Sequence, residues 1–150
     1  MSKSRNIFLL ILFHLLFNNL SAHSEVKLPA LISDNMVLQR NTPINIWGWA
    51  APNEKVTVKL GKSEAAATAD AKGNWAAKLP AMKAGGPFDI TVSGKNVLNL
   101  KNILIGDVWI CSGQSNMQMS VSGSNNAKEE IAGAKYPNIR LFTVSRVTAC

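Results

Sequence analysis

Histidine is nearly absent from this chain of 150 residues, which contains only His14 and His23. Both lie among the first 24 residues, so no imidazole occurs in the remainder of the sequence. An imidazole is the most common general base of hydrolases that use a serine or a cysteine nucleophile. Residues 25–150 therefore cannot contain a complete catalytic triad that includes histidine.

Cysteine is equally scarce, with Cys111 and Cys150 as the only two. Two cysteines are too few for a disulfide framework, and a zinc site needs several Cys and His residues at short spacing. We therefore expect no metal site. Because Cys111 closes an apolar stretch, we expect its thiol to be buried. The spacing alone leaves open whether the two cysteines pair.

The chain also lacks a block of positive charge, although 16 Lys and Arg residues against 9 Asp and Glu give it a net charge of +7. The lysines are spread singly along the sequence, and the aromatic residues do not alternate with them. A nucleic-acid-binding protein needs a basic stripe or a stacking platform. We therefore expect a solvated surface and no nucleic-acid partner.

No apolar run is long enough to span a bilayer comfortably. The longest, Ile7 to Phe17, has about a dozen residues, the size of a signal-peptide core. Lys3 and Arg5 precede it, and a polar step with small residues follows at 18–24. The sequence predicts a signal peptide over residues 1–24, export to the periplasm or the medium, and no membrane attachment after cleavage. A membrane anchor or a buried helix is the alternative.

Residues 25–102 show the period-two alternation of strands that have one face on a core. The alternating segments are 44–50, 55–60, 75–79, 88–92 and 97–100. Turn residues separate them at 51–54, 70–73, 84–87 and 93–96. Short strands joined by Gly, Pro and Asn turns predict an antiparallel β-sandwich.

The pattern changes in residues 103–150. Ile103 to Ile110 is an almost continuous apolar run, which is typical of a strand that is covered on both faces. Helix-forming residues follow at 125–134, and a second apolar strand is expected at 139–144. Strand, turn, helix and strand in this order predict the incomplete start of an α/β domain.

A polar turn ends the apolar run, with the sequence Gly-Gln-Ser-Asn at residues 113–116. A turn between a strand end and a helix start holds a serine rigidly and places unpaired N–H groups beside it. Ser115 is therefore a candidate nucleophile. A capped turn is the structural alternative, because Ser, Asn and Gly are ordinary turn and cap residues. The pattern is not a G-x-S-x-G elbow, since Met117 occupies the last glycine position. Asp107 either orients the site or stabilises the turn.

A family resemblance covers nearly all of the chain after residue 24. The segments that carry it are LPALISDNMVLQR (28–40), IWGWAAPNEKVTV (46–58), GNWAAKLPAMKAGGPFDITV (73–92), KNILIGDVWICSGQSNM (101–117) and YPNIRLFTV (136–144). They resemble the N-terminal part of bacterial sialate O-acetylesterases, which are carbohydrate esterases of the SGNH-hydrolase type. In such a protein a β-sandwich precedes an α/β SGNH-hydrolase domain.

The resemblance implies a secreted serine esterase that removes O-acetyl groups from sialic acid or related acetylated glycans, without a cofactor. It places the nucleophile at Ser115, whose backbone N–H contributes to the oxyanion hole, and it implies that Gln114 and Asn116 shape the site. The family carries its Asp and His near the C-terminal end of the catalytic domain, as Asp-x-x-His, and this sequence has no such segment. A serine without a base is a poor nucleophile. We therefore expect an N-terminal fragment that is inactive by itself.

Two other functions remain open at this point. The first is a non-catalytic glycan-binding β-sandwich that uses Trp47, Trp49 or Trp75. The second is a degenerate truncated product. The sequence does not indicate an oligomeric state.

Overall fold

Strands make up most of the computed structural model, which describes residues 25–144. The predicted signal peptide at 1–24 and Cys150 lie outside the described residues. The strands are β1 (Val37–Gln39), β2 (Ile44–Trp49), β3 (Lys55–Leu60), β4 (Ser63–Thr68), β5 (Asn74–Leu79), β6 (Gly85–Ser93) and β7 (Val97–Gly106). Two short 3₁₀ helices, η1 (Ser115–Gln118) and η2 (Val121–Gly123), and one α-helix, α2 (Ala127–Gly133), follow them.

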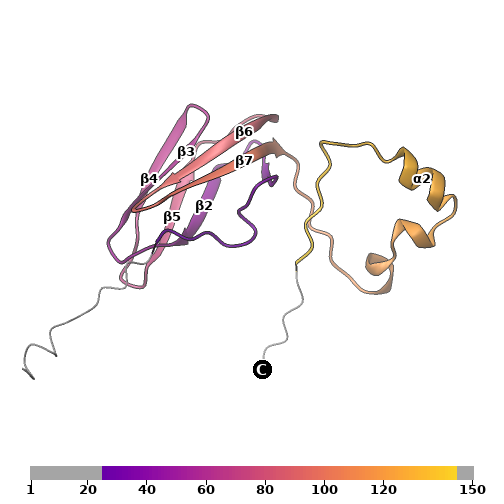
Figure 1. The fold of residues 1–150 in the computed structure, drawn as a ribbon, viewed down its shortest axis with the longest axis horizontal. Coiled ribbons are helices and arrows are strands. Elements are labelled where there is room, and N and C mark those ends of the chain that lie inside the picture. Colours follow the sequence, from indigo (N-terminus) through magenta and orange to yellow (C-terminus); the bar gives the residue numbers. More distant parts are fainter. Residues whose placement is uncertain (1–24, 145–150) are drawn as a thin grey trace, which may run out of the picture.

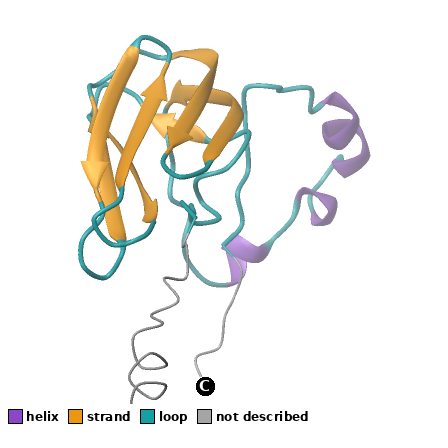
Figure 2. Cartoon of the chain, turned by 60° about the vertical axis from the view of Figure 1, so that its left-hand side comes forward, coloured by secondary structure: helices purple, strands orange, loops and turns teal. Residues whose placement is uncertain are grey.

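The strands form a five-stranded sheet in the order β1-β7-β6-β3-β4 and a two-stranded sheet of β2 and β5 (Figure 1). All neighbouring strands are antiparallel except β1 and β7, which are parallel and pair Val37 with Leu104. The larger sheet is thus mixed, where the sequence predicted antiparallel pairing throughout. The strands curl around a common interior, and the helices lie apart from them (Figure 2).

One hydrophobic core lies between the strands and holds them together. Alternation along β2 buries Ile44 and Ile46 while it exposes Asn45 and Trp47. The same period buries one side of the other strands, and the core includes Val56, Val58, Leu60, Leu79, Ile90, Val92, Ile103 and Ile105. Full burial of one such aliphatic side chain contributes roughly 1.5–3 kcal/mol. The predicted alternating segments correspond to β2, β3, β5, β6 and β7.

Strand β7 crosses the position where the sequence changes character. It runs without interruption from Val97 to Gly106, so the expected break between residues 102 and 103 lies inside the strand. Ile103 and Ile105 belong to the same core as the earlier strands. The prediction that this strand continues to Ile110 is wrong beyond Gly106, because no neighbouring strand pairs with residues 107–110. The turn expected at 84–87 was also wrong, since β6 begins at Gly85 with an irregular register.

The helix predicted at 125–134 is confirmed by α2, but the strand predicted at 139–144 is not formed. No residue between 107 and 144 is buried. A strand needs a partner for its backbone hydrogen bonds, and residues 139–144 have none among the described residues. In the part of the chain from 25 to 144, no helix has the length and apolarity required to cross a bilayer.

Candidate active site

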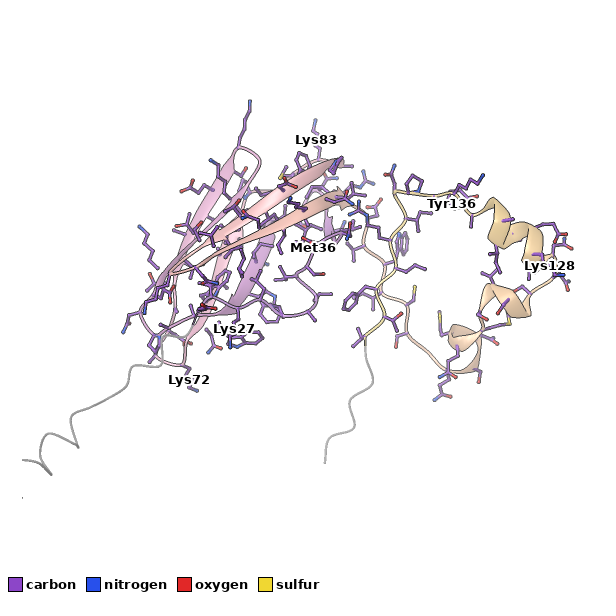
Figure 3. The ribbon with its side chains drawn as sticks, viewed as in Figure 1. Lys27, Met36, Lys72, Lys83, Lys128 and Tyr136 are labelled. Atoms are coloured by element: carbon purple, nitrogen blue, oxygen red, sulfur yellow. The ribbon has the colours of Figure 1, made fainter. Side chains whose placement is uncertain are left out.

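Ser115 lies in the segment that projects from the strands. Strand β7 ends at Gly106, residues 107–114 form a loop, and η1 begins at Ser115 itself. In Figure 3, Lys128 lies at the far end of the same projecting segment and Tyr136 on the stretch that leads back from it. Ser115 is therefore placed by a loop and a single helical turn, where the sequence predicted the end of a strand.

The backbone at Ser115 adopts an uncommon conformation, with φ at 38°. A non-glycine residue with positive φ is infrequent, and such residues concentrate at functional sites and sharp turns. Gly113, two residues earlier, has φ at 156°, and a Cβ there would lie 2.9 Å from Cγ of Met117. The glycine thus allows the chain to fold back closely before the serine.

The polar side chains of Gly-Gln-Ser-Asn do not cap this turn. Backbone groups close it, because the N–H of Met117 donates to the carbonyl of Gln114 at 3.0 Å. Gln114 occupies the N-cap position without a side-chain hydrogen bond to the turn. All three side chains, those of Gln114, Ser115 and Asn116, are exposed. The capping expected in the structural alternative is therefore not formed, although Gly113 does serve the turn.

No general base lies beside Ser115 in the described part of the chain. Residues 25–144 include no histidine, and nowhere in this range do three His, Cys, Asp or Glu residues gather as metal ligands would. The loop carboxylate, Asp107, instead accepts a hydrogen bond from Nε of Arg40 at 2.8 Å. This hydrogen bond lowers the pKa of Asp107 and raises that of Arg40. The ion pair gives Asp107 a structural contact with Arg40, and its predicted role in orienting the site stays a prediction.

Residues of β1 and the position after it fix the start of the loop that leads to Ser115. The N–H of Arg40 donates to the carbonyl of Gly106 at 2.8 Å, in addition to the ion pair with Asp107. Oε1 of Gln39 accepts the N–H of Val108 at 2.9 Å. The parallel strand β1 therefore directs the chain as it leaves β7.

A second contact returns the end of the projecting segment to the strands. The guanidinium of Arg140 donates to the carbonyl and to Oδ1 of Asn102, the latter at 2.9 Å, and to the carbonyl of Met36 at 3.4 Å. Nδ2 of Asn102 in turn donates to Oδ1 of Asn35 at 2.6 Å. The sequence alone does not indicate these residues, since no local pattern signals which carbonyl a lone arginine will contact.

Two expected positions differ in the structure. Cys111 was predicted to be buried, but it is exposed, because β7 ends five residues before it. Its pairing with Cys150 lies outside the described residues. Trp75, one of the three tryptophans considered for sugar binding, is only 3% exposed and belongs to the core. Trp47 and Trp49 remain on the surface.

Known proteins resemble this chain in sequence and in fold. No model of a protein family matches it. The mouse sialate O-acetylesterase is 36% identical over 140 residues, which cover 85% of the chain and 26% of the mouse protein. The human sialate O-acetylesterase is 35% identical over 153 residues, covering 93% of the chain and 29% of that protein. A carbohydrate acetylesterase from Xanthomonas citri has a crystal structure that matches with a TM-score of 0.73 and 37% identity, over 75% of this chain and 26% of that one.

These relatives define a class, that of carbohydrate esterases. Within this class, the chain belongs to the sialate O-acetylesterase family. It spans about a quarter of the length of the curated relatives that it matches.

Proposed function

We propose that this chain is part of a secreted serine esterase that removes O-acetyl groups from sialic acid or related acetylated glycans. The observation that carries the proposal is the identity of about one third with sialate O-acetylesterases over most of the chain. The acetylated-sugar substrate follows from the names of these relatives and of the Xanthomonas citri enzyme. In this proposal the strands form the β-sandwich that precedes an SGNH-type catalytic domain, which begins in residues 103–150.

Ser115 is the proposed nucleophile. Its hydroxyl is exposed, its backbone is held at a positive φ, and its N–H has no acceptor among the described residues. Attack on the acetyl carbon forms an acetyl-enzyme and expels the sugar hydroxyl, and water then releases acetate. The N–H of Ser115 contributes to stabilising the oxyanion, while the amides of Gln114 and Asn116 shape the site.

A base is required to take the proton from Ser115, and it comes from outside residues 25–144 in this proposal, because that range holds no histidine. For the chain of 150 residues alone we therefore propose little or no esterase activity. The thiol of Cys111 does not replace the serine in this proposal, since neither a base nor a cationic residue adjoins it in the sequence.

A chimera tests the nucleophile directly. Residues 25–144 replace the matching part of the Xanthomonas citri carbohydrate acetylesterase, and hydrolysis of p-nitrophenyl acetate is measured. The variant Ser115→Ala should lose activity on the order of 10³-fold or more, as removal of a nucleophile does in other hydrolases. Ser112→Ala is the matched control, since Ser112 is an exposed serine in the same loop and should leave activity nearly unchanged.

A fluorophosphonate probe gives a second reading that does not depend on turnover. It should label Ser115 in the chimera and scarcely label the chain of 150 residues. If the Ser115→Ala variant of an active chimera keeps its activity, the assignment of Ser115 as the nucleophile is refuted. Rapid labelling of the short chain would refute the claim that the serine needs a base from elsewhere.

A further inference from the structure

The outer face of the β2–β5 pair carries two exposed indoles. Trp47 and Trp49 are 41% and 43% exposed, although the alternate positions of β2 are buried in the core. Their ring centroids are 5.9 Å apart and their planes cross at 80°, so the two rings form a corner. Large aromatic side chains on an open surface commonly mark a place where a ligand binds.

Polar and basic side chains surround the two indoles in three rows of directly paired residues. Directly paired residues of antiparallel strands share one face of the sheet. Lys27, Trp49 and Asn74 form one row, Trp47 and Ala76 the next, and Asn45 and Lys78 the third. We call the side chains of Lys27, Asn45, Trp47, Trp49, Asn74 and Lys78 the tryptophan face.

The backbone holds this face rigidly. Lys27 and Trp49 exchange two hydrogen bonds, of 2.8 and 2.9 Å, so Lys27 extends the small sheet beside the end of β2. Gly48 permits this close approach, because a Cβ there would lie 2.1 Å from the carbonyl oxygen of Lys27. Ala76 opposite Trp47 is too small to cover the ring.

The charge of the tryptophan face is positive. Neither Lys27 nor Lys78 forms an ion pair with a described residue. A carboxylate that hydrogen-bonds to a member of the face is that of Asp70, which accepts a hydrogen bond from Nδ2 of Asn74 at 3.1 Å and from two backbone N–H groups. These donors occupy the Asp70 carboxylate at one end of the face. The ammonium groups of Lys27 and Lys78 remain available to an anion.

We infer that the tryptophan face binds a saccharide that bears a carboxylate. An indole packs against the C–H side of a pyranose ring, and the perpendicular neighbour borders the ring on a second side. The two ammonium groups attract the sugar carboxylate, and the amides of Asn45 and Asn74 offer partners to its hydroxyls. A strand of nucleic acid fits less well, because two separate lysines do not make a basic track for its backbone. This site requires no part of the Ser115 turn.

Binding is measured by ligand-observed NMR on the full chain carrying Ser115→Ala, so that failure of the esterase proposal leaves the result unaffected. The probes are N-acetylneuraminic acid and its methyl ester, which lacks the charge. The acid should bind, and Trp47→Ala or Trp49→Ala should weaken it roughly tenfold or more. Trp109→Ala is the matched control, because Trp109 is 85% exposed but lies in the projecting segment, and it should leave binding unchanged.

Lys78→Gln separates the charge from the stacking. It should weaken binding of the acid roughly threefold or more and leave binding of the methyl ester unchanged. Thermal unfolding of each variant checks that the fold is intact. The inference is overturned if neither sugar binds, if the two tryptophan variants bind the acid as well as the parent chain, or if a thymidine octanucleotide binds more tightly at the same residues. Sedimentation that shows a dimer lost in Trp47→Ala would also overturn it, since the face would then contact a second copy.

Discussion

The strands at 25–106 and the projecting segment at 107–144 differ in whether their apolar side chains are buried. The strands bury their aliphatic side chains against one another in a single core. The projecting segment carries Trp109, Ile110, Met117, Leu141 and Phe142, and none of its residues is buried. Its helix α2 has only seven residues and no buried side chain, and a helix of that length is marginal without packing. A similar apolar content thus yields a folded body only where the period-two pattern lets strands cover each other.

The largest expected effect compares two leucines, one from each region. Leu60 is fully buried and Leu141 is 94% exposed. Leu60→Ala should lower the free energy of unfolding by about 2–5 kcal/mol through lost burial and a cavity. Leu141→Ala should change it by less than about 0.5 kcal/mol. Urea unfolding followed by circular dichroism measures both, and equal losses would break the distinction between the regions.

A glycine in each region gives the next comparison. Gly48→Ala should cost about 1–3 kcal/mol, because its Cβ collides with the backbone of Lys27, which cannot withdraw as a flexible side chain can. Gly123→Ala meets open space and should be close to neutral. The same unfolding experiment applies. Stability of Gly48→Ala equal to that of the parent would show that the bridge between Lys27 and Trp49 is loose.

The pH dependence of the strand region should come in part from Glu54, which is 9% exposed. Its carboxylate accepts the N–H groups of Lys95 and Ala51 at 2.6 and 3.0 Å, and the bond from Lys95 is the main cause of its lowered pKa. A carboxyl whose pKa is lower in the folded state stabilises the fold above its unfolded pKa. This stability is lost as the pH falls through the folded pKa.

Glu54→Gln should therefore cost about 1–2 kcal/mol at neutral pH and much less in acid, since the amide keeps an acceptor but not the charge. Glu64→Gln, at an exposed position on β4, is the control and should follow the parent at every pH. A constant difference between Glu54→Gln and the parent from neutral pH to acid would contradict this role of the carboxylate.

Arg140→Ala should give the smallest change in global stability, under about 0.5 kcal/mol, because its hydrogen bonds to Asn102 are exposed and only the long bond to Met36 is part-buried. Its effect should be local, since Arg140 returns the projecting segment to Asn102 and Met36. Cleavage by trypsin after Lys128 and Lys135 should become several-fold faster, as expected when local opening limits proteolysis. Lys135→Ala removes one of the cleavage sites but no contact with the strands, and it should leave cleavage after Lys128 unchanged.

The sequence predicts the strands that alternate cleanly, because their pattern and their packing agree. It does not reveal β4, whose sequence Ser-Glu-Ala-Ala-Ala-Thr is rich in a poor strand former and becomes a strand by pairing with β3. The parallel partner β1 has three residues, too few for a pattern. The strand expected at 139–144 has a suitable composition, but composition cannot supply a neighbouring strand.

The candidate site likewise has features that the sequence predicts and features that it does not. Ser115, Gln114 and Asn116 were located from the turn residues and from the family resemblance, and their roles stay predictions. The structure adds that these side chains make no capping hydrogen bond, which the motif alone does not indicate. The contacts of Arg40 with Asp107 and of Arg140 with Asn102 join residues more than thirty positions apart, so no local sequence signal predicts them.

Hydrogen exchange of the full chain, read by mass spectrometry, tests most directly whether the fold has one self-sufficient body and one segment without a core. Amides in β2, β3, β5, β6 and β7 should exchange at least about 10³-fold more slowly than in an unfolded chain, as core strands do. Amides in residues 107–144, including the turn at Ser115, should exchange at least about tenfold faster than those in the strands, because none of these residues is buried. Protection of η1 or α2 comparable to that of the strands would contradict the account.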